Sequence, residues 1–247
     1  MMRIADIHCH VLPYVDDGAQ DWDESAELLK MQYEQGVRLV CCTPHLQKGM
    51  FEIPDKEILE QFGLLKEMAE KIFRGNLKVY LSREYYCDEA FLRRLEKNAV
   101  IPYGNGGYLL TEFSHRYTPD QFFEYVEKVI DHGYRPLIAH VERYPELQDI
   151  EDIEELVRMG AKIQINAGSL LKMEGRQQAR WAKKLLKEGL VHVVASDAHD
   201  VQTRTPELEK AANYLEKKLG TEEAEKLLWK NQIQIMKSRR RVENGIN

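Results

Sequence analysis

Short apolar runs alternate along this chain with longer segments in which apolar residues recur at helical spacing. The runs are rich in β-branched residues, which is typical of buried strands. The predicted strands are Ile4–Cys9, Val37–Thr43, Val79–Ser82, Tyr108–Glu112, Pro136–His140, Lys162–Asn166 and His192–Ser196. This regular alternation predicts an α/β fold with parallel strands.

The intervening segments have charged faces, and several end at a glycine that can stop a helix, such as Gly133 or Gly160. The predicted helices are Asp23–Gln35, Asp55–Phe73, Glu89–Asn98, Pro119–His132, Ile150–Met159 and Arg176–Lys187. From Pro206 onward we expect further helix, broken near Gly220, with Thr221 as the N-cap of the next segment. Since no linker divides the chain, a single domain over residues 1–247 is predicted.

Polar side chains of metal-binding type stand at the carboxyl ends of the predicted strands. His8 and His10 are two residues apart in an extended segment, so both imidazoles point to the same side. One histidine at a strand end is more often structural than functional, but here every strand end carries such a residue. These side chains converge only if the sheet closes, so we predict a barrel of seven parallel strands rather than a doubly wound open sheet.

Five of the eight histidines fall at strand ends, and His115, His132 and His192 are interpreted as structural. The candidate metal ligands are His8, His10, Asp17, His45, Glu84, Glu112, His140, Asp197 and His199. One transition-metal ion takes roughly four to six ligands, so at least two ions are expected. Imidazole and carboxylate without thiolate suit Mn²⁺, Fe²⁺ or Zn²⁺, and Glu84 is suited to bridge two of them. Cys9 faces the other side of its strand and is expected to be a small buried residue.

Composition narrows the class of protein. The chain has 247 residues and a net charge of −6, and we find neither a long basic face nor an apolar stretch of membrane-spanning length. General nucleic-acid binding and membrane insertion are therefore disfavoured, and a cytoplasmic protein is expected. The four cysteines form no C-x-x-C pair and are expected to be reduced and structural.

Five other features of the sequence bear on function. Cys87 and Arg93 match the bare C-x5-R pattern of cysteine-dependent phosphatases, but the acids between them indicate a helix start instead. The glycines of segment 104–107 precede a strand and indicate a turn, and the arginines at 239–241 indicate a solvated helix end. The segment 46–52 is expected to form a mobile wall over a substrate. Asn166 and Ser169 are expected to contact ligands or substrate without binding metal.

The motifs that carry these residues resemble the PHP (polymerase and histidinol phosphatase) superfamily. They are His8-Cys-His-x-Leu-Pro-x-x-Asp-Asp17-Gly-Ala, Thr-Pro-His45, Arg-Glu84-Tyr-Tyr, Glu112-Phe, Ala-His140-x-Glu-Arg143-Tyr and Ala-Ser-Asp197-Ala-His199. The closest resemblance is to the branch of bacterial protein-tyrosine phosphatases encoded with capsular and exopolysaccharide genes. It runs from Met1 to about Pro206, and only the C-terminal helices match weakly.

This resemblance implies a distorted (β/α)7 barrel, similar to the TIM barrel, with three metal ions, usually manganese. It implies one ion held by His8, His10, Glu84 and Asp197, a second by Glu84, Glu112 and His140, and a third by Asp17, His45 and His199. Asp16 remains an alternative to its neighbour Asp17. It further implies that Arg143 and Arg204 clamp phosphate, and that the substrate is the phosphotyrosine tail of a bacterial tyrosine autokinase that controls polysaccharide synthesis.

Electrostatics agrees with phosphate chemistry. Four of the nine ligands are carboxylates, so three divalent ions leave a net charge of about +2 where a phosphoryl group docks. Such ions lower the pKa of bound water toward about 7 and so supply a hydroxide for attack on phosphorus. The main hypothesis is a metal-dependent phosphotyrosine-protein phosphatase. The alternatives are another PHP phosphoesterase, namely a histidinol-phosphate phosphatase or a nuclease-like enzyme, and a non-catalytic metal-binding module.

Overall fold

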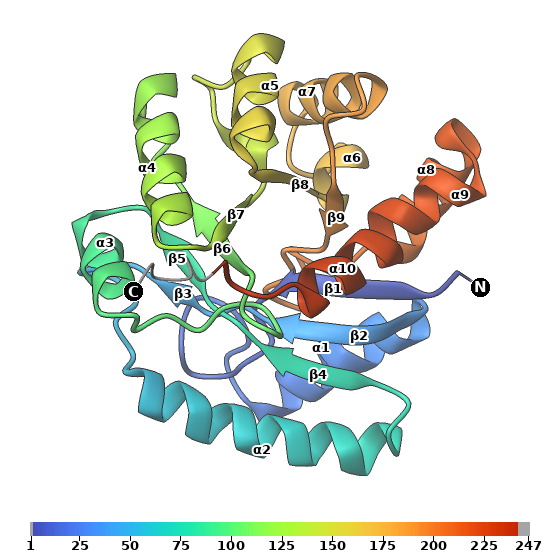
Figure 1. Cartoon of the computed structure of the whole chain (residues 1–247). Coiled ribbons are helices and arrows are strands. Elements are labelled where there is room, and N and C mark those ends of the chain that lie inside the picture. Colours follow the sequence, from blue (N-terminus) through green and yellow to red (C-terminus); the bar gives the residue numbers. More distant parts are fainter. Residues whose placement is uncertain (1, 242–247) are drawn as a thin grey trace.

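All paired strands of the main sheets run parallel in the computed structural model, which describes residues 2–241 (Figure 1). One sheet has the order β1-β2-β4 and the other the order β3-β5-β6-β7-β8-β9. The strands are β1 Ile4–Cys9, β2 Val37–Cys42, β3 His45–Leu46, β4 Lys78–Leu81, β5 Glu84–Tyr86, β6 Tyr108–Glu112, β7 Arg135–Ile138, β8 Lys162–Asn166 and β9 Val193–Ala195. The predicted α/β class with parallel strands is confirmed.

Two short strands that the sequence does not predict, β3 and β5, follow the ends of the second and third predicted strands, and the sheet expected to be single is divided into two. The first break falls at Thr43 and Pro44, between β2 and β3, and the second at Ser82 and Arg83, between β4 and β5. Pro44 has no N–H to donate to a ladder, and the Thr43 hydroxyl oxygen instead accepts from the Cys9 amide at 3.1 Å. The amide of Ser82 still bonds the Cys42 carbonyl at 2.9 Å, so the two sheets remain joined.

The first and last strands meet at their carboxyl ends rather than along a full ladder. The His10 amide donates to the Ala198 carbonyl, and the Asp197 amide donates to the His8 carbonyl, both at 2.8 Å. The buried Asp6 carboxylate also accepts from the amide of Ser196 at 3.0 Å and from its hydroxyl at 2.5 Å. We call this junction the β1–β9 seam. It brings residues from the two ends of the sequence to the same place.

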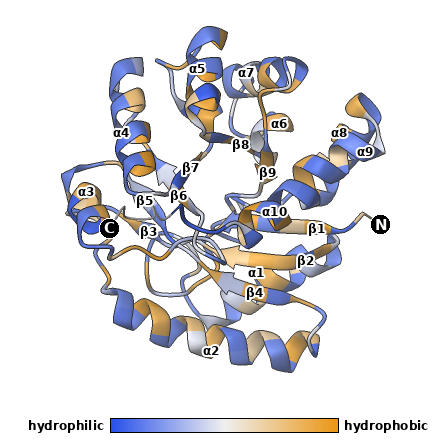
Figure 2. Cartoon of the chain, in the orientation of Figure 1, coloured by the Kyte–Doolittle hydropathy of each residue, from blue (hydrophilic) through white to orange (hydrophobic). Residues whose placement is uncertain are grey.

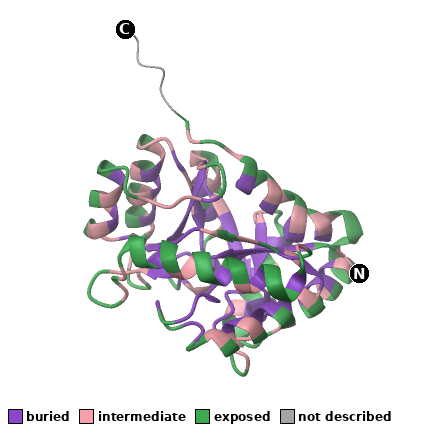
Figure 3. Cartoon of the chain, turned by 90° about the horizontal axis from the view of Figure 1, so that it is seen from below, coloured by how far each residue is buried: buried purple, intermediate pink, exposed green. Residues whose placement is uncertain are grey.

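Helices cover the outside of the strands, with apolar faces turned inward and charged faces outward (Figures 2 and 3). They are α1 Trp22–Glu34, α2 Asp55–Phe73, α3 Glu89–Glu96, α4 Pro119–Asp131, α5 Ile150–Met159, the short α6 Ala167–Leu170 and α7 Arg176–Lys187, with a 3₁₀ turn at Val141–Arg143. The larger core cluster lies between these helices and the sheets. A second cluster, which includes Ala5, Ile7 and Leu110, joins side chains from the other face of the strands.

The chain after Pro206 is helical, as predicted. It forms α8 Leu208–Leu219, α9 Thr221–Glu225, a π-helical turn at Lys226–Lys230 and α10 Asn231–Lys237. Ile235 and Met236 of α10 pack into the second core cluster. The prediction that Thr221 caps α9 is wrong, because Gly220, at φ 87°, makes the break and Thr221 already lies in the helix. None of the described helices is long and apolar enough to cross a membrane.

Candidate metal centre

The nine predicted ligands lie together at the carboxyl ends of the strands. His8 is the last residue but one of β1, His45 begins β3, Glu84 begins β5 and Glu112 ends β6, while the others stand in the loops that follow strands. Donor atoms within 4.8 Å of one another form three groups: His8, His10, Glu84 and Asp197; His10, Asp17, His45 and His199; His45, Glu84 and Glu112. The first group has the membership that the sequence implied for one ion. The second adds His10 to the set expected for another. The third has His45 in the place expected for His140, which belongs to none of the three groups but lies 3.1 Å from Glu84 Oε1 and 3.7 Å from Glu112 Oε1.

Glu84 lies at the centre of these groups and is fully buried. Its Oε2 atom is 3.0 Å from His8 Nε2 and 3.2 Å from His10 Nε2. Its Oε1 atom is 3.1 Å from His140 Nε2. Burial alone raises the pKa of this carboxyl, but positive charge on His8 and His45 outweighs it and holds the pKa well below its usual range. Its two oxygens thus face different ligands, as a bridging carboxylate requires.

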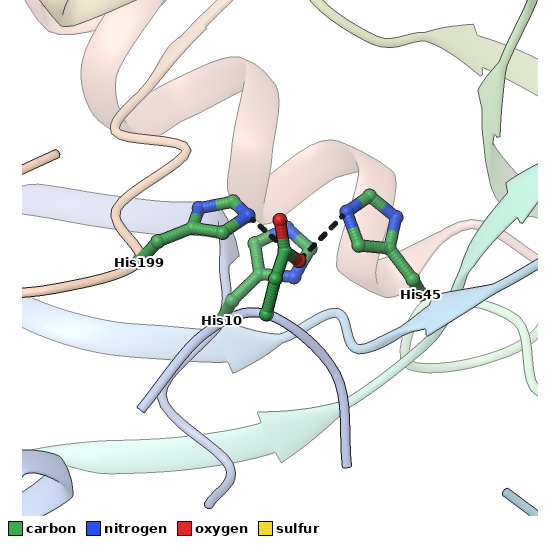
Figure 4. Close-up of side chains that lie close together, drawn as sticks. His10, His45 and His199 are labelled. Carbon is green, nitrogen blue, oxygen red and sulfur yellow. Dashed lines mark ion pairs between the residues drawn. The ribbon is translucent and has the colours of Figure 1, made fainter. Parts of the chain in front are cut away.

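The side chains of the neighbouring residues Asp16 and Asp17 contact different atoms of the cluster. Asp17 Oδ1 lies 3.5 Å from His45 Nε2 and 3.4 Å from His199 Nε2, and Figure 4 shows these two imidazoles pointing at the carboxylate between them. Asp16 instead accepts from His10 Nδ1 at 2.8 Å and from the His45 amide at 2.9 Å. Asp17 therefore belongs to the ligand group, and Asp16 orients one of its histidines.

Several imidazole nitrogens in the cluster are buried and lack a hydrogen-bond partner in the described structure, including His10 Nε2, His45 Nδ1 and His199 Nε2. The opposite nitrogens of His10 and His199 face Asp16 and the Asp197 carbonyl, which are acceptors. In its neutral form, each of these two rings carries its proton on that side and turns its unprotonated nitrogen into the cluster. Metal-binding histidines are held in this way, so the residues fit a group of divalent cations.

Negative charge is crowded at the same place. Burial, followed by the charges of Glu84 and Asp197, raises the pKa of the Glu112 carboxyl well above its usual range. A cation placed among these groups would relieve that repulsion and hold all of the carboxyls ionised. The electrostatics therefore agrees with the chemistry of the donor atoms.

The two predicted arginines reach the cluster through Asp197. Arg143 Nη1 lies 2.8 Å and Arg204 Nη2 lies 2.9 Å from Asp197 Oδ2. The Asn166 amide also donates to this oxygen at 2.9 Å, whereas Oδ1 faces His8 Nε2 at 3.3 Å. Both arginines line a cavity of about 120 Å³ beside the ligands. A phosphoryl group at the cluster would therefore have two guanidinium groups within reach.

Sequence reasoning missed two supports, the buried Gln164 and the partly exposed Glu174. The Gln164 side-chain oxygen accepts from His8 Nδ1 at 3.1 Å and from the His140 amide at 2.8 Å, and Glu174 pairs with Arg143. Gln164 had a signal, since it is a polar residue inside an otherwise apolar strand. Glu174 had none, because it lies in a loop whose course the sequence pattern does not reveal.

Most of the features set aside are placed as expected, but the prediction that the arginines at 239–241 form a solvated helix end is wrong. α10 ends at Lys237, and the chain then runs along the turn before β6, where Arg239 pairs with Gly106 and the Arg241 amide donates to the Gly133 carbonyl at 2.9 Å.

Cys87 is fully buried, and Asp88 caps α3 by accepting from the Phe91 amide at 2.8 Å. The C-x5-R segment is thus a helix start and not a phosphate-binding loop. Cys9 is fully buried in the larger core cluster, away from the ligand groups. The segment 104–107 is a turn before β6.

Segment 46–52 stands against the cluster. Gln47 and Phe51 exchange backbone hydrogen bonds of 3.0 and 2.9 Å, and the Phe51 ring stacks on His45 with centroids 5.2 Å apart. The segment therefore forms a wall beside a ligand, and its movement stays a prediction. Ser169 is buried in α6. His115, His132 and His192 belong to none of the ligand groups found among the described residues.

Comparison with known proteins agrees with this geometry. The profile of the capsular polysaccharide synthesis family CpsB/CapC matches residues 4–237. The tyrosine-protein phosphatase CpsB of Streptococcus agalactiae is 34% identical over 94% of this chain and 98% of that protein. CpsB of Streptococcus pneumoniae is 35% identical over 94% of this chain and 97% of its own, and YwqE of Bacillus subtilis, also a tyrosine-protein phosphatase, is 32% identical over 88% and 85%.

The fold of this chain is also similar to that of proteins with solved structures. A crystal structure from work on YwqE of Bacillus subtilis and CpsB of Streptococcus pneumoniae, described as metal-dependent tyrosine phosphatases, matches with a TM-score of 0.87 and 31% identity. It covers 96% of this chain and 95% of that one. Histidinol phosphate phosphatase from Lactococcus lactis matches at TM-score 0.55 and 12% identity over 91% of this chain and 94% of that one, which shows a shared fold. From its sequence and its fold, the chain belongs to the CpsB/CapC family.

Proposed function

We propose that this protein is a metal-dependent phosphatase that hydrolyses phosphotyrosine in proteins. The observation that carries the proposal is the joint placement of nine metal-type ligands and two arginines at one face of the strands. Relatives that match this chain over nearly its whole length are tyrosine phosphatases, and one is described as metal-dependent. The acidic chain and the absence of a long basic face favour a protein substrate over a nucleic acid.

The proposed centre holds three divalent ions, preferably Mn²⁺. The ligand sets are His8, His10, Glu84 and Asp197 for the first ion, Glu84, Glu112 and His140 for the second, and Asp17, His45 and His199 for the third. Glu84 faces members of every set in the structure, which supports its role as a bridge. When bound, the ions supply Lewis acidity for the phosphoryl oxygens and activate water.

The chain's own side chains then bind and orient the substrate. Arg143 and Arg204 approach the same point from different loops, so each can donate to oxygens of the phosphoryl group that the ligand cluster holds. The phenol group of tyrosine has an ordinary pKa of about 10, so its phenolate leaves more readily than an alkoxide. The leaving group therefore depends less on protonation by a general acid. A cysteine nucleophile is not needed.

The natural substrate in this proposal is the phosphotyrosine tail of a bacterial tyrosine kinase that controls capsule or exopolysaccharide synthesis. The description of the family as one of capsular polysaccharide synthesis supports this assignment. The proposal also places the enzyme in the cytoplasm, where its four buried cysteines remain reduced.

One assay tests the proposal. Hydrolysis of a phosphotyrosine peptide is compared with hydrolysis of histidinol phosphate, each with Mn²⁺ and with EDTA. We expect Mn²⁺-dependent release of phosphate from the peptide, loss of activity in EDTA and little turnover of histidinol phosphate. Preference for histidinol phosphate would identify a different phosphatase on the same fold. Peptide hydrolysis that persists in EDTA would exclude the metal mechanism.

The Cys87→Ser variant supplies the control for a thiol mechanism. Burial raises the pKa of the Cys87 thiol well above its usual range, so no thiolate is available at neutral pH. We expect this variant to keep peptide hydrolysis within a fewfold of wild type. A folded variant, checked by circular dichroism, that had lost all activity would contradict the proposal.

A further inference from the structure

Glu174 holds the guanidinium group of Arg143 from the side opposite the ligand cluster. Its Oε2 atom accepts from Arg143 Nε at 2.7 Å, while Arg143 Nη1 lies 2.8 Å from Asp197 Oδ2. The Asn166 amide donates to Glu174 Oε1 at 3.2 Å and so fixes the carboxylate itself. Arg143 is thus tied at two of its three nitrogens. No carboxylate within ion-pair distance of the remaining nitrogen is found in the described part of the chain.

The loop that carries Glu174 has a backbone shaped for this contact. Lys172 has a left-handed conformation, at φ 69°, which is unfavourable for a residue with a side chain, and Gly175 follows at φ 124°. The Met173 amide bonds back to the Gly168 carbonyl at 3.0 Å. A Cβ atom on Gly168 would lie only 3.0 Å from Glu174 Oε1, so the glycine leaves room for the carboxylate.

Arg204 has no comparable support. Its side chain is 36% exposed, and its ion pairs, at 2.9 Å and 3.8 Å, are to the ligand-cluster residues Asp197 and Asp17. Arg143 is 24% exposed and has a carboxylate partner outside the cluster. The two arginines therefore differ: one is held in place before substrate arrives, and the other is free to adapt to it.

We infer that Glu174 is a positioning residue, which fixes the plane of the Arg143 guanidinium so that its free N–H groups meet the phosphoryl oxygens. The inference rests on the proposed function. A guanidinium fixed in advance loses less side-chain entropy when phosphate binds and offers its donors at set angles. Glu174 contacts Arg143 and Asn166 and lines the same cavity, and no hydrogen bond or ion pair joins it to the nine candidate ligands in the described part of the chain; its proposed effect on substrate runs through Arg143.

The test compares Glu174→Ala and Glu174→Gln with wild type at saturating Mn²⁺. We expect Glu174→Ala to lower kcat/KM for a phosphotyrosine peptide on the order of tenfold and to weaken inhibition by inorganic phosphate similarly. The Glu174→Gln variant should recover part of the loss, because an amide oxygen still accepts from Nε. Metal content should not change in either variant.

A double-mutant cycle separates positioning from an independent role. In an Arg143→Ala background, Glu174→Ala should cause almost no further loss, because the group through which it acts is gone. If the fold-losses of the two single substitutions multiply in the double variant, the inference is overturned. Unchanged phosphate inhibition and kinetics in Glu174→Ala would also overturn it.

Gly168→Ala provides a second test that leaves the carboxylate in the chain. The new methyl group pushes on Glu174 Oε1, so we expect a smaller loss of kcat/KM and of phosphate affinity in the same direction. Gly63→Ala in α2 is the matched control, since a Cβ there meets nothing within 4 Å, and it should behave as wild type. If Glu174→Ala fails to fold, Gly168→Ala and Glu174→Gln decide the question, and kinetics like wild type in both would overturn the inference.

The assay also separates this inference from the proposed function. A wild-type protein that fails to hydrolyse the peptide would end the proposed function. The affinity for inorganic phosphate, measured by calorimetry on the Mn²⁺-loaded protein, would then still test the contact between Glu174 and Arg143. Active wild type with unaffected Glu174 variants would end the inference alone.

Discussion

The two carboxylate oxygens of Asp197 contact different groups. Oδ1 faces the imidazoles of His8 and His10 at 3.3 and 3.5 Å, whereas Oδ2 accepts from two arginines and an amide. The residue has a left-handed backbone at φ 53°, which turns the chain sharply after β9. A single side chain thereby couples the metal ligands to the groups that would bind phosphate.

Arg204 provides the sharpest test of that coupling. We expect Arg204→Lys to keep its metal and fold but to lose on the order of 10²-fold in kcat/KM, about 2.7 kcal/mol, because lysine cannot donate to two phosphate oxygens in one plane. Arg204→Ala should lose more. The measurement is peptide hydrolysis at saturating Mn²⁺. Activity within a fewfold of wild type for both variants would remove Arg204 from the site.

His192 makes folding sensitive to acid, away from the metal centre. Its Nδ1 accepts from the Ile163 amide at 3.3 Å, and burial, with Lys162 nearby, lowers its pKa to about 4. The unfolded chain, with a pKa of about 6.5, takes up the proton first. Stability therefore changes little above pH 6.5 and falls as the pH drops from 6.5 to 4, by on the order of 1 kcal/mol at pH 5.5.

The His192→Gln variant should not show this loss of folding stability at acid pH. Denaturant unfolding of both proteins in EDTA at pH 7.5 and pH 5.5 measures it, because the chelator removes the contribution of bound metal. We expect the free energy of unfolding of wild type to fall by on the order of 1 kcal/mol more than that of the variant between the two pH values. Equal losses would show that His192 does not titrate in this range.

At the scale of elements, α10 is docked against the turn that precedes β6. A Cβ atom on Gly104, at φ 43°, would lie 2.1 Å from the Met236 carbonyl oxygen, and the Asn105 amide bonds that same oxygen at 2.9 Å. Gly160 is also left-handed, at φ 111°, but a Cβ there meets nothing within 4 Å. A comparison of substitutions at these two glycines therefore separates the effect of close packing from the effect of backbone strain.

We expect Gly104→Ala to lower the melting temperature clearly more than Gly160→Ala. Both variants carry about 1 kcal/mol of backbone strain, but only Gly104→Ala must also displace α10. Thermal unfolding followed by circular dichroism compares them. If Gly104→Ala lowers the melting temperature less than Gly160→Ala does, α10 can shift away from the new methyl group without loss of stability.

Hydrophobic periodicity predicted the helices and strands well where burial determines them. Asp55–Phe73, Ile150–Met159 and Arg176–Lys187 begin and end as expected, and so does β8. The second and third predicted strands end close to the breaks at Pro44 and Arg83, but the strands β3 and β5 beyond these breaks were missed, because two or three residues are too few to show a periodic pattern. The cause of the breaks is tertiary: the buried Arg83 side chain donates to the His45 carbonyl at 2.7 Å and to Asp55 at 2.9 Å.

The candidate site could be predicted as a set of residues but not as a geometry. Ligand-type side chains at strand ends are visible in the sequence because parallel strands share one end. The choice between Asp16 and Asp17 depends on which of two adjacent carboxylates faces the cluster, and this follows from the path of the loop. Glu174 lies far from the motifs and is brought to Arg143 by tertiary packing alone.

For the whole molecule, the metal centre should contribute to stability. Ions that bind only the folded chain stabilise it by about 2.7 kcal/mol per site at a hundredfold excess over Kd. For a chain of this length that corresponds to roughly 5–10 °C in melting temperature. Melting with Mn²⁺ and with EDTA measures the shift. An equal melting temperature in both would contradict tight binding in the folded state.

The β1–β9 seam has a consequence for the order of events during synthesis. His8 and His10 leave the ribosome first, and Asp197 follows after about 190 further residues, roughly 10–40 s later at bacterial rates of elongation. Until β9 docks on β1, the group of His8, His10, Glu84 and Asp197 lacks a member. Full coordination by this group therefore waits until β9 has docked on β1. A chain truncated before Asp197 would offer an ion only three of the four side chains.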